Sequence, residues 1–361
     1  ELAIRMTLVA NNDSVIYVAS PDPYSNTSPS TLLTQNQSNL DSVIGSASYD
    51  IGHVFSTGGG GLAGLGVVCR STSKARGETG LPNPVGDAFY VDFVAHEMGH
   101  QFGGNHTFNG SDGNCAGTNR NASTAYEPGS GSTIMAYAGI CGTHDLQPNS
   151  DPYFHGKSFD EIVTYTTSGS GAACAASSST SNTAPSVEAG PAYSIPARTP
   201  FALTGSASDA EADALTYGWE QFDLGAADTG TTLVDDGSRP IFRSFNPTTS
   251  PTRVFPKLAD VLAGTTTYGE TLPTTTRTLN FRLTARDNRA AGGGVNSDTT
   301  ALSVTDTGSA FAITVPATAV SWAGSSSQTV TWNVAGTASA PISCANVTIA
   351  LTPDSQVSVA P

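Results

Sequence analysis

The stretch HEMGHQFGGNH, residues 96–106, decides how the first part of this chain must fold. It contains the pattern HExxHxxGxxH, in which His96 and His100 lie four residues apart and His106 follows Gly103. On a helix, residues four apart lie on one face, so the first two imidazoles can point at one ion. Glycine adopts the positive φ that ends a helix, so the chain can turn and bring His106 to the same ion. Three imidazoles leave one position open for water, as a catalytic zinc site requires.

Features around this pattern strengthen it, because HExxH alone also occurs by accident on ordinary surface helices. Glu97 follows the first ligand, where a carboxylate can take a proton from a water on the metal. The segment 86–102 predicts a helix with Asp87 as its N-cap. Its apolar residues recur at helical spacing and predict a core-facing stripe; they are Val91, Val94, Ala95, Met98 and Phe102.

A second motif lies downstream, where STIMAYAGIC at 132–141 puts Met135 29 positions after His106. The extended histidine motif and this methionine turn together resemble the metzincin clan of zinc endopeptidases. Within the clan, the chain looks like the bacterial reprolysin-like members. GLAGLGVVC at 61–69 resembles the reprolysin strand that lies antiparallel to bound substrate. The likeness covers roughly the first half of the chain.

The resemblance implies an α+β metzincin protease domain over residues 1–170, with Zn²⁺ held by the three motif histidines. It implies that Glu97 is the general base and that Met135 packs beneath the metal without ligating it. Tyr137, two residues after that methionine, resembles the astacin and serralysin pattern, which implies that its hydroxyl stabilises the transition state. Thr107 departs from snake-venom and related reprolysins, which carry Asp after the third histidine.

Composition excludes several classes of function. The chain has 361 residues, a formal net charge of −15 and three lysines, Lys74, Lys157 and Lys257. Such an acidic balance argues against binding to nucleic acid or to anionic membrane surfaces. No apolar run approaches the ~20 residues needed to span a bilayer. We therefore expect no nucleic-acid partner and no transmembrane segment. The metzincin resemblance implies protein or peptide substrates, and we expect a monomer.

The cysteines carry a prediction about disulfides and location. There are five, none in CxxC spacing, so a structural zinc cluster is not expected. Four fall in the protease-like part and can form two disulfides in three pairings, or remain buried free thiols. We predict the pairs Cys115–Cys141 and Cys69–Cys174, with Cys344 unpaired. Disulfides suit an oxidising compartment, so we expect a secreted, extracellular bacterial protein.

Periodicity divides the first domain into elements. Alternating apolar residues predict a strand at 2–10, and apolar spacing predicts a helix at 30–44. A strand at 51–55, a flexible glycine run at 58–61 and a closing helix at 158–167 are also expected. The metzincin fold usually opens with a further strand and helix. We therefore expect the domain to be N-terminally truncated.

The composition changes after the closing helix. A Gly-, Ala- and Ser-rich stretch predicts a linker at 171–184. Short β-type runs between turn residues predict an all-β sandwich at 185–306. The run at 207–223 resembles the immunoglobulin-like or polycystic-kidney-disease-like modules that are appended to secreted bacterial enzymes. Residues 307–361 start a second such module, which we expect to be truncated.

Acidic residues in the first sandwich raise a further possibility. Asp209, Glu211 and Asp213 alternate along one run, and hard cations such as Ca²⁺ favour clustered carboxylates. The alternative is a solvated acidic turn without an ion.

Two functions remain open. The first is a secreted zinc endopeptidase with β-sandwich accessory domains, and the second is an adhesion or binding protein that uses an inactive protease-like scaffold. An intact Glu97 favours the first, because a scaffold has no need for a base there. The Met-turn and the edge strand disfavour a third possibility, a non-peptidase zinc hydrolase. His53, His144 and His155 have no ligand spacing to the motif, so we expect structural roles for them.

Overall fold

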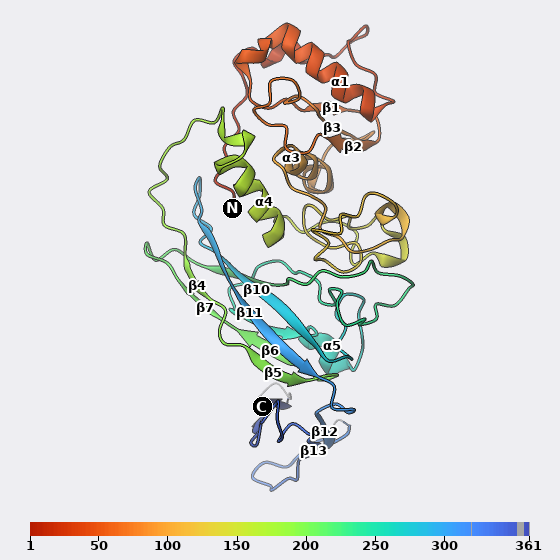
Figure 1. The fold of residues 1–361 in the computed structure, drawn as a ribbon, viewed down its shortest axis with the longest axis vertical. Coiled ribbons are helices and arrows are strands. Elements are labelled where there is room, and N and C mark those ends of the chain that lie inside the picture. The colour runs from red at the N-terminus through yellow and green to blue at the C-terminus, as the bar shows by residue number, and fades with distance from the viewer. Residues whose placement is uncertain (319, 352–356, 361) are drawn as a thin grey trace.

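The computed structural model describes residues 1–318, 320–351 and 357–360. Figure 1 shows helices and a small sheet in the N-terminal part, long strands in the middle, and short hairpins near the C-terminus. Among the described residues, none of the helices is long and apolar enough to cross a membrane.

A three-stranded sheet forms the centre of the N-terminal part. Its strands are β1 (Val54–Ser56), β2 (Gly60–Ala63) and β3 (Gly77–Gly80), in the order β1-β3-β2. β3 is parallel to β1 and antiparallel to β2, which leaves β2 at one edge. Helix α1 (Pro29–Leu40) lies on one side of this sheet and α3 (His96–Gln101) on the other (Figure 1).

Several predicted elements of this part are confirmed with shifted ends. The helix expected at 30–44 is α1 followed by a π-helical turn, Asp41–Gly45. The closing helix is α4 (Gly156–Thr167). The strand expected at 61–69 ends at Ala63 and is followed by turns, and β3 was not predicted. Short 3-10 turns connect the elements at Asn12–Val15, Ser46–Ser48, Gly113–Cys115, Gly142–His144 and Ser170–Ala172.

The strand predicted at 2–10 is wrong. Residues 1–9 pair with no strand, and three of their large apolar side chains, Ile4, Met6 and Leu8, are exposed; Leu8 is 81% exposed. Alternation of apolar residues makes a strand only where a neighbouring strand satisfies the backbone and covers one face. Instead, side chains anchor the start of the segment, because the Glu1 carboxylate accepts hydrogen bonds from the Arg286 guanidinium at 2.7 and 2.9 Å.

The helix that carries the histidine motif is continuous but not uniform. It begins with α2 (Asp87–Phe89), passes through a π-helical segment at Tyr90–Ala95 and ends with α3. Its N-cap is Gly86, so the prediction of Asp87 as N-cap is wrong by one residue. Asp87 instead lies in the first turn, where its charge favours the helix dipole.

The face of this helix that meets the sheet is also not the predicted one. Glu97 and Gln101 point at the sheet, against Gly61 and Gly77. The predicted stripe is only half-buried, and four of its members line a cavity of about 630 Å³ with residues 1–6; they are Val94, Ala95, Met98 and Phe102. Small glycines on the sheet make room for polar side chains, which apolar periodicity does not reveal.

The middle part consists of packed layers of β-sheet; that residues 185–306 form an immunoglobulin-like sandwich stays a prediction. A four-stranded sheet has the order β5-β11-β10-β8, and the pairs β4-β7 and β6-β9 accompany it. The strands are β4 (Ser186–Glu188), β5 (Tyr193–Pro196), β6 (Phe201–Thr204), β7 (Ser206–Ser208), β8 (Thr216–Gln221), β9 (Thr252–Phe255), β10 (Arg277–Arg286) and β11 (Val295–Thr305), with helix α5 at Leu258–Ala263. Phe255 of β9 packs on Phe281 of β10 at 4.8 Å between ring centroids, so one apolar core joins the layers.

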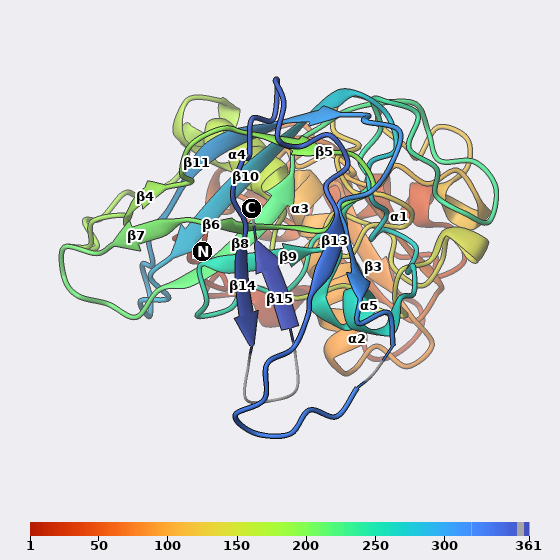
Figure 2. The same ribbon diagram turned by 90° about the horizontal axis from the view of Figure 1, so that it is seen from below.

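The C-terminal residues form two further strand pairs. β12 (Ala312–Val315) pairs with β13 (Thr331–Asn333), and β14 (Thr348–Leu351) pairs with β15 (Val357–Ala360). Figure 2 shows β14 and β15 side by side. Part of the second module predicted at 307–361 lies outside the described residues, and the domain boundaries stay predictions.

Candidate metal centre

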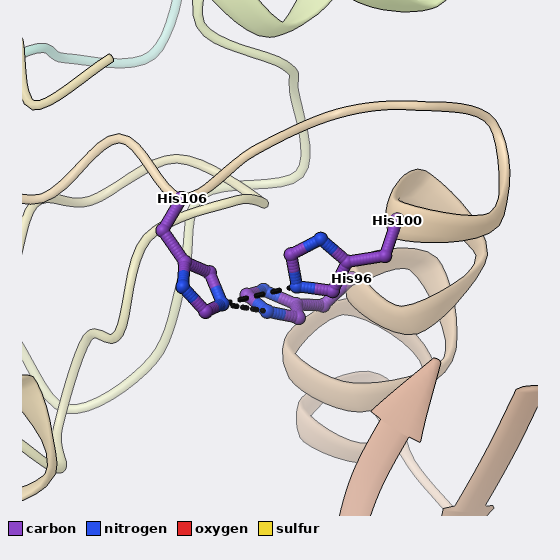
Figure 3. A group of neighbouring side chains, drawn as sticks. All are labelled: His96, His100 and His106. Atoms are coloured by element: carbon purple, nitrogen blue, oxygen red, sulfur yellow. Dashed lines mark hydrogen bonds between the residues drawn. The ribbon is translucent and has the colours of Figure 1, made fainter. Parts of the chain in front are cut away.

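Three imidazoles converge from two structural elements (Figure 3). His96 and His100 project from α3, one turn apart. Gly103 has φ +97° and ends the helix, so the chain turns back and presents His106 to them. The Nε2 atom of His106 lies 3.0 Å from that of His100 and 3.2 Å from that of His96. The sequence-predicted ligands are therefore brought together.

The hydrogen bonds of the rings define their tautomers. Each Nδ1 faces a backbone carbonyl: that of Ile134 for His96, Gly104 for His100 and Asn119 for His106, at 2.7, 2.7 and 2.6 Å. A carbonyl only accepts, so each Nδ1 carries the proton. Each neutral ring then directs an Nε2 lone pair into the centre.

Three lone pairs at this separation repel one another unless a cation lies between them. Tetrahedral zinc with bonds of 2.0–2.1 Å places two ligand nitrogens about 3.3 Å apart, close to the spacing in the structure. Burial lowers the pKa of His96 well below its usual value and that of His100 to about 3, and it also lowers the pKa of His106. The rings are therefore neutral at pH 7, the form that binds metal. The residues fit a zinc ion.

Glu97 is buried beside these ligands and faces the edge strand. Burial, and then the charge of Glu78, raise the pKa of its carboxyl to about 8. A Cβ atom at Gly61 of β2 would lie 2.8 Å from its Cγ and 2.9 Å from its Cδ, so the missing side chain of Gly61 makes the space for it. A cation at the histidines would favour the ionised carboxylate.

Met135 and Tyr137 border the centre on the other side. Met135 is fully buried, and its sulfur lies against Gly99, between the first two ligands. The Tyr137 ring lies 4.5 Å from that of His106 and 5.5 Å from that of His96, measured between centroids. Burial, and then the charge of Glu97, raise the pKa of Tyr137 to about 12, which keeps its hydroxyl protonated at neutral pH.

Glu127 is a residue of this region that the sequence analysis missed. Its buried carboxylate accepts hydrogen bonds from Thr107, which follows the third ligand, and from Ser132 and Thr133, which open the Met-turn. The Thr107 amide also donates to the Met135 carbonyl at 3.2 Å. Thr107, noted as a departure from the family pattern, is thus part of the link between the two motifs.

Two disulfides brace the site from outside. The structure joins Cys115 to Cys141 and Cys69 to Cys174, the pairs that were predicted. The first connects the loop after His106 to the end of the Met-turn. Cys344 is a free thiol in the structure.

The other three histidines lie apart from the metal centre. His53 bonds to Gln101 and Thr79 at 2.8 and 2.7 Å, and burial lowers its pKa to about 4. His144 and His155 are also buried, and both contact the β-rich middle part of the chain (the middle domain below). His144 lies against the Gly230 carbonyl and His155 against Glu220. Their surroundings agree with the structural roles expected.

The carboxylate cluster in the structure differs in one member from the predicted calcium set. Asp209 and Asp213 place carboxylate oxygens within 4.8 Å of each other and of Asp287, which the sequence analysis did not select. Glu211 does not complete this cluster but accepts a hydrogen bond from Thr183 at 2.9 Å. Asp287 directly follows β10 and is 74 residues from Asp213, so spacing along one run could not identify it. Calcium binding stays a prediction.

Comparison with known proteins supports the metallopeptidase interpretation of the N-terminal part. Residues 1–154 match the family model described as metallo-peptidase family M12B, reprolysin-like, which supports a reprolysin-like metallopeptidase. No curated protein matches the chain. The crystal structure of the four N-terminal immunoglobulin domains of Dscam1 isoform 4.44 is similar over 43% of this chain and 33% of that one, at 14% identity and a TM-score of 0.17. A likeness this weak carries no argument about fold.

Proposed function

We propose that this chain is a secreted, zinc-dependent endopeptidase. The observation that carries the proposal is that the Nε2 atom of His106 lies 3.0 Å from that of His100 and 3.2 Å from that of His96, beside a buried glutamate. The family match over residues 1–154 supports the protease class. Two disulfides and the acidic composition are compatible with an extracellular location.

His96, His100 and His106 would hold the ion. Zinc bound there supplies a lowered water pKa, about 7, and polarisation of the scissile carbonyl. Glu97 accepts the proton of the attacking water and delivers it to the leaving amine. The Tyr137 hydroxyl, protonated at neutral pH, donates to the oxyanion as it forms.

Strand β2 would align the substrate. It ends the sheet order β1-β3-β2 and packs on Glu97 through Gly61, so its outer edge pairs with no other strand of that sheet. An extended peptide can add to such an edge through backbone hydrogen bonds. This geometry favours an unfolded or loop segment of a protein as substrate.

The test separates binding from chemistry. Glu97→Gln keeps the three ligands and should bind one zinc per chain while losing nearly all cleavage of a generic protein substrate. Glu188→Gln, an exposed glutamate on β4, is the matched control and should keep full activity. A wild-type protein that binds zinc but cleaves nothing would favour the adhesion scaffold, and one that binds no zinc would overturn the proposed site.

A further inference from the structure

The segment that connects β8 to β9 leaves the middle domain and contacts the loop that carries the third histidine. Asp228 lies at its tip and is fully buried, with 0% exposure. A buried carboxylate is costly unless hydrogen bonds satisfy it. Every close donor to its oxygens comes from the protease domain: Asn109 Nδ2 at 2.7 Å and the Gly129 amide at 2.6 Å. Arg239 of its own domain lies farther away, at 3.9 Å.

These two donors belong to opposite ends of the loop that follows His106. Asn109 is three residues after the ligand, and Gly129 precedes the Met-turn. The Asp228 amide also donates to the Asn109 carbonyl at 2.9 Å. Because its carboxylate accepts from both Asn109 and Gly129, Asp228 connects the two ends of the loop.

The contact continues to the ligand itself. Asn109 Oδ1 accepts hydrogen bonds from Arg120 Nε and Nη2 at 3.0 and 2.8 Å, and the same Nη2 donates to the Gly225 carbonyl. The neighbour of Arg120 is Asn119, whose carbonyl accepts the Nδ1 proton of His106. Asp228 is thus connected to the His106 ring through the hydrogen-bonded side chains of Asn109 and Arg120 and the peptide unit between Asn119 and Arg120.

We propose that Asp228 is a positioning residue for the zinc site, so that the middle domain is a structural part of the metal centre. The inference rests on the proposed function. Partners in the outer shell of a metal site fix the tautomer and direction of a ligating histidine, and their loss typically lowers metal affinity or activity 10–100-fold. His106 depends on such support because it lies beyond the helix that orients His96 and His100.

The same domain offers a matched control. Asp235 is a buried carboxylate that accepts hydrogen bonds from Gly237, Thr274, Thr275 and Arg277. All four partners lie inside the middle domain. Asp228→Asn and Asp235→Asn therefore make the same change, in which an amide NH₂ group replaces one acceptor oxygen. Only Asp228 has a route to His106.

The experiment measures zinc affinity of metal-free, full-length protein by competition with a chromophoric chelator, together with the visible spectrum of the Co²⁺ form and the melting temperature. We expect Asp228→Asn to lose 10–100-fold in zinc affinity and to change the Co²⁺ bands. Asp235→Asn should lower the melting temperature but leave both metal readouts unchanged, because sites without shared partners act independently.

Zinc affinity and Co²⁺ bands of Asp228→Asn that equal those of wild type would overturn the inference, as would an equal affinity loss in Asp235→Asn. If Asp228→Asn does not fold, Arg120→Gln tests the same route, because the half-buried Arg120 lies between Asp228 and His106. Unchanged zinc affinity in Arg120→Gln would then overturn the inference. Wild-type protein that binds no zinc would instead refute the proposed function.

Discussion

Replacing Gly61 by alanine should displace Glu97, the proposed general base, without unfolding the protein. The new Cβ would lie 2.8 Å from Glu97 Cγ and 2.9 Å from Cδ, closer than the 3.5–4.0 Å of an ordinary carbon contact. The glutamate side chain must therefore retreat by about 1 Å. A displacement of this size can lower turnover about 10²-fold.

The stability of the variant should hardly change. The clash involves only one flexible side chain. Alanine also lowers the conformational entropy of the unfolded chain relative to glycine, which by itself stabilises a protein by roughly 0.4–1 kcal/mol. The three histidines are untouched, so zinc stoichiometry should also stay the same. Loss of kcat with normal folding and normal metal content is thus the expected pattern.

Gly59→Ala supplies the control from the same glycine run, because a Cβ there meets nothing within 4 Å. The assay is kcat and KM on a quenched peptide, with melting temperature and zinc content measured on the same samples. Wild-type kcat in Gly61→Ala, or an equal loss in Gly59→Ala, would refute the reasoning about Glu97.

Two further changes test a tyrosine beside the site and a buried carboxyl on β8. Tyr137→Phe should lower kcat about 10²-fold or less with little change in KM, because its hydroxyl acts mainly on the developing oxyanion; an equal rise in KM would contradict this. Glu220→Gln tests a carboxyl on β8 whose pKa is raised by burial from 4.5 to about 7. Between these two pH values the folded state holds a proton that the unfolded state has released. Wild type therefore loses stability as the pH rises from 4.5 to 7. Glutamine keeps an acceptor for the Gly156 amide, and chemical unfolding should show its advantage over wild type growing by up to about 3 kcal/mol from pH 5 to pH 8; the same advantage at both pH values would exclude this role for Glu220.

The convergence of the three histidines could be predicted from sequence because their geometry is local. His96 and His100 are related by the helical repeat, and one glycine turn brings in His106, so eleven consecutive residues contain the ligand set. The second motif needs no spatial knowledge either, because the methionine turn is itself a short, specific pattern.

What could not be predicted lies in contacts between distant segments. Gly61 gives no sign in the sequence that its missing side chain accommodates Glu97. Alternation at 2–10 indicates a strand, yet pairing depends on a neighbour that periodicity does not describe. Asp228 is 119 residues from Asn109, in the β-rich middle part of the chain, so no local pattern connects the two.

This division has a physical consequence for the third ligand. The helix orients the first two histidines through local backbone hydrogen bonds. His106 instead depends on contacts between segments that are far apart in the sequence. They are the Cys115–Cys141 bond, the Glu127 cluster and the Asp228 contact. Each closes a loop whose entropy must be offset by the contacts that it makes. Zinc binding and docking of the middle domain both favour the closed loop and should therefore reinforce one another, because each reduces the ordering cost left for the other.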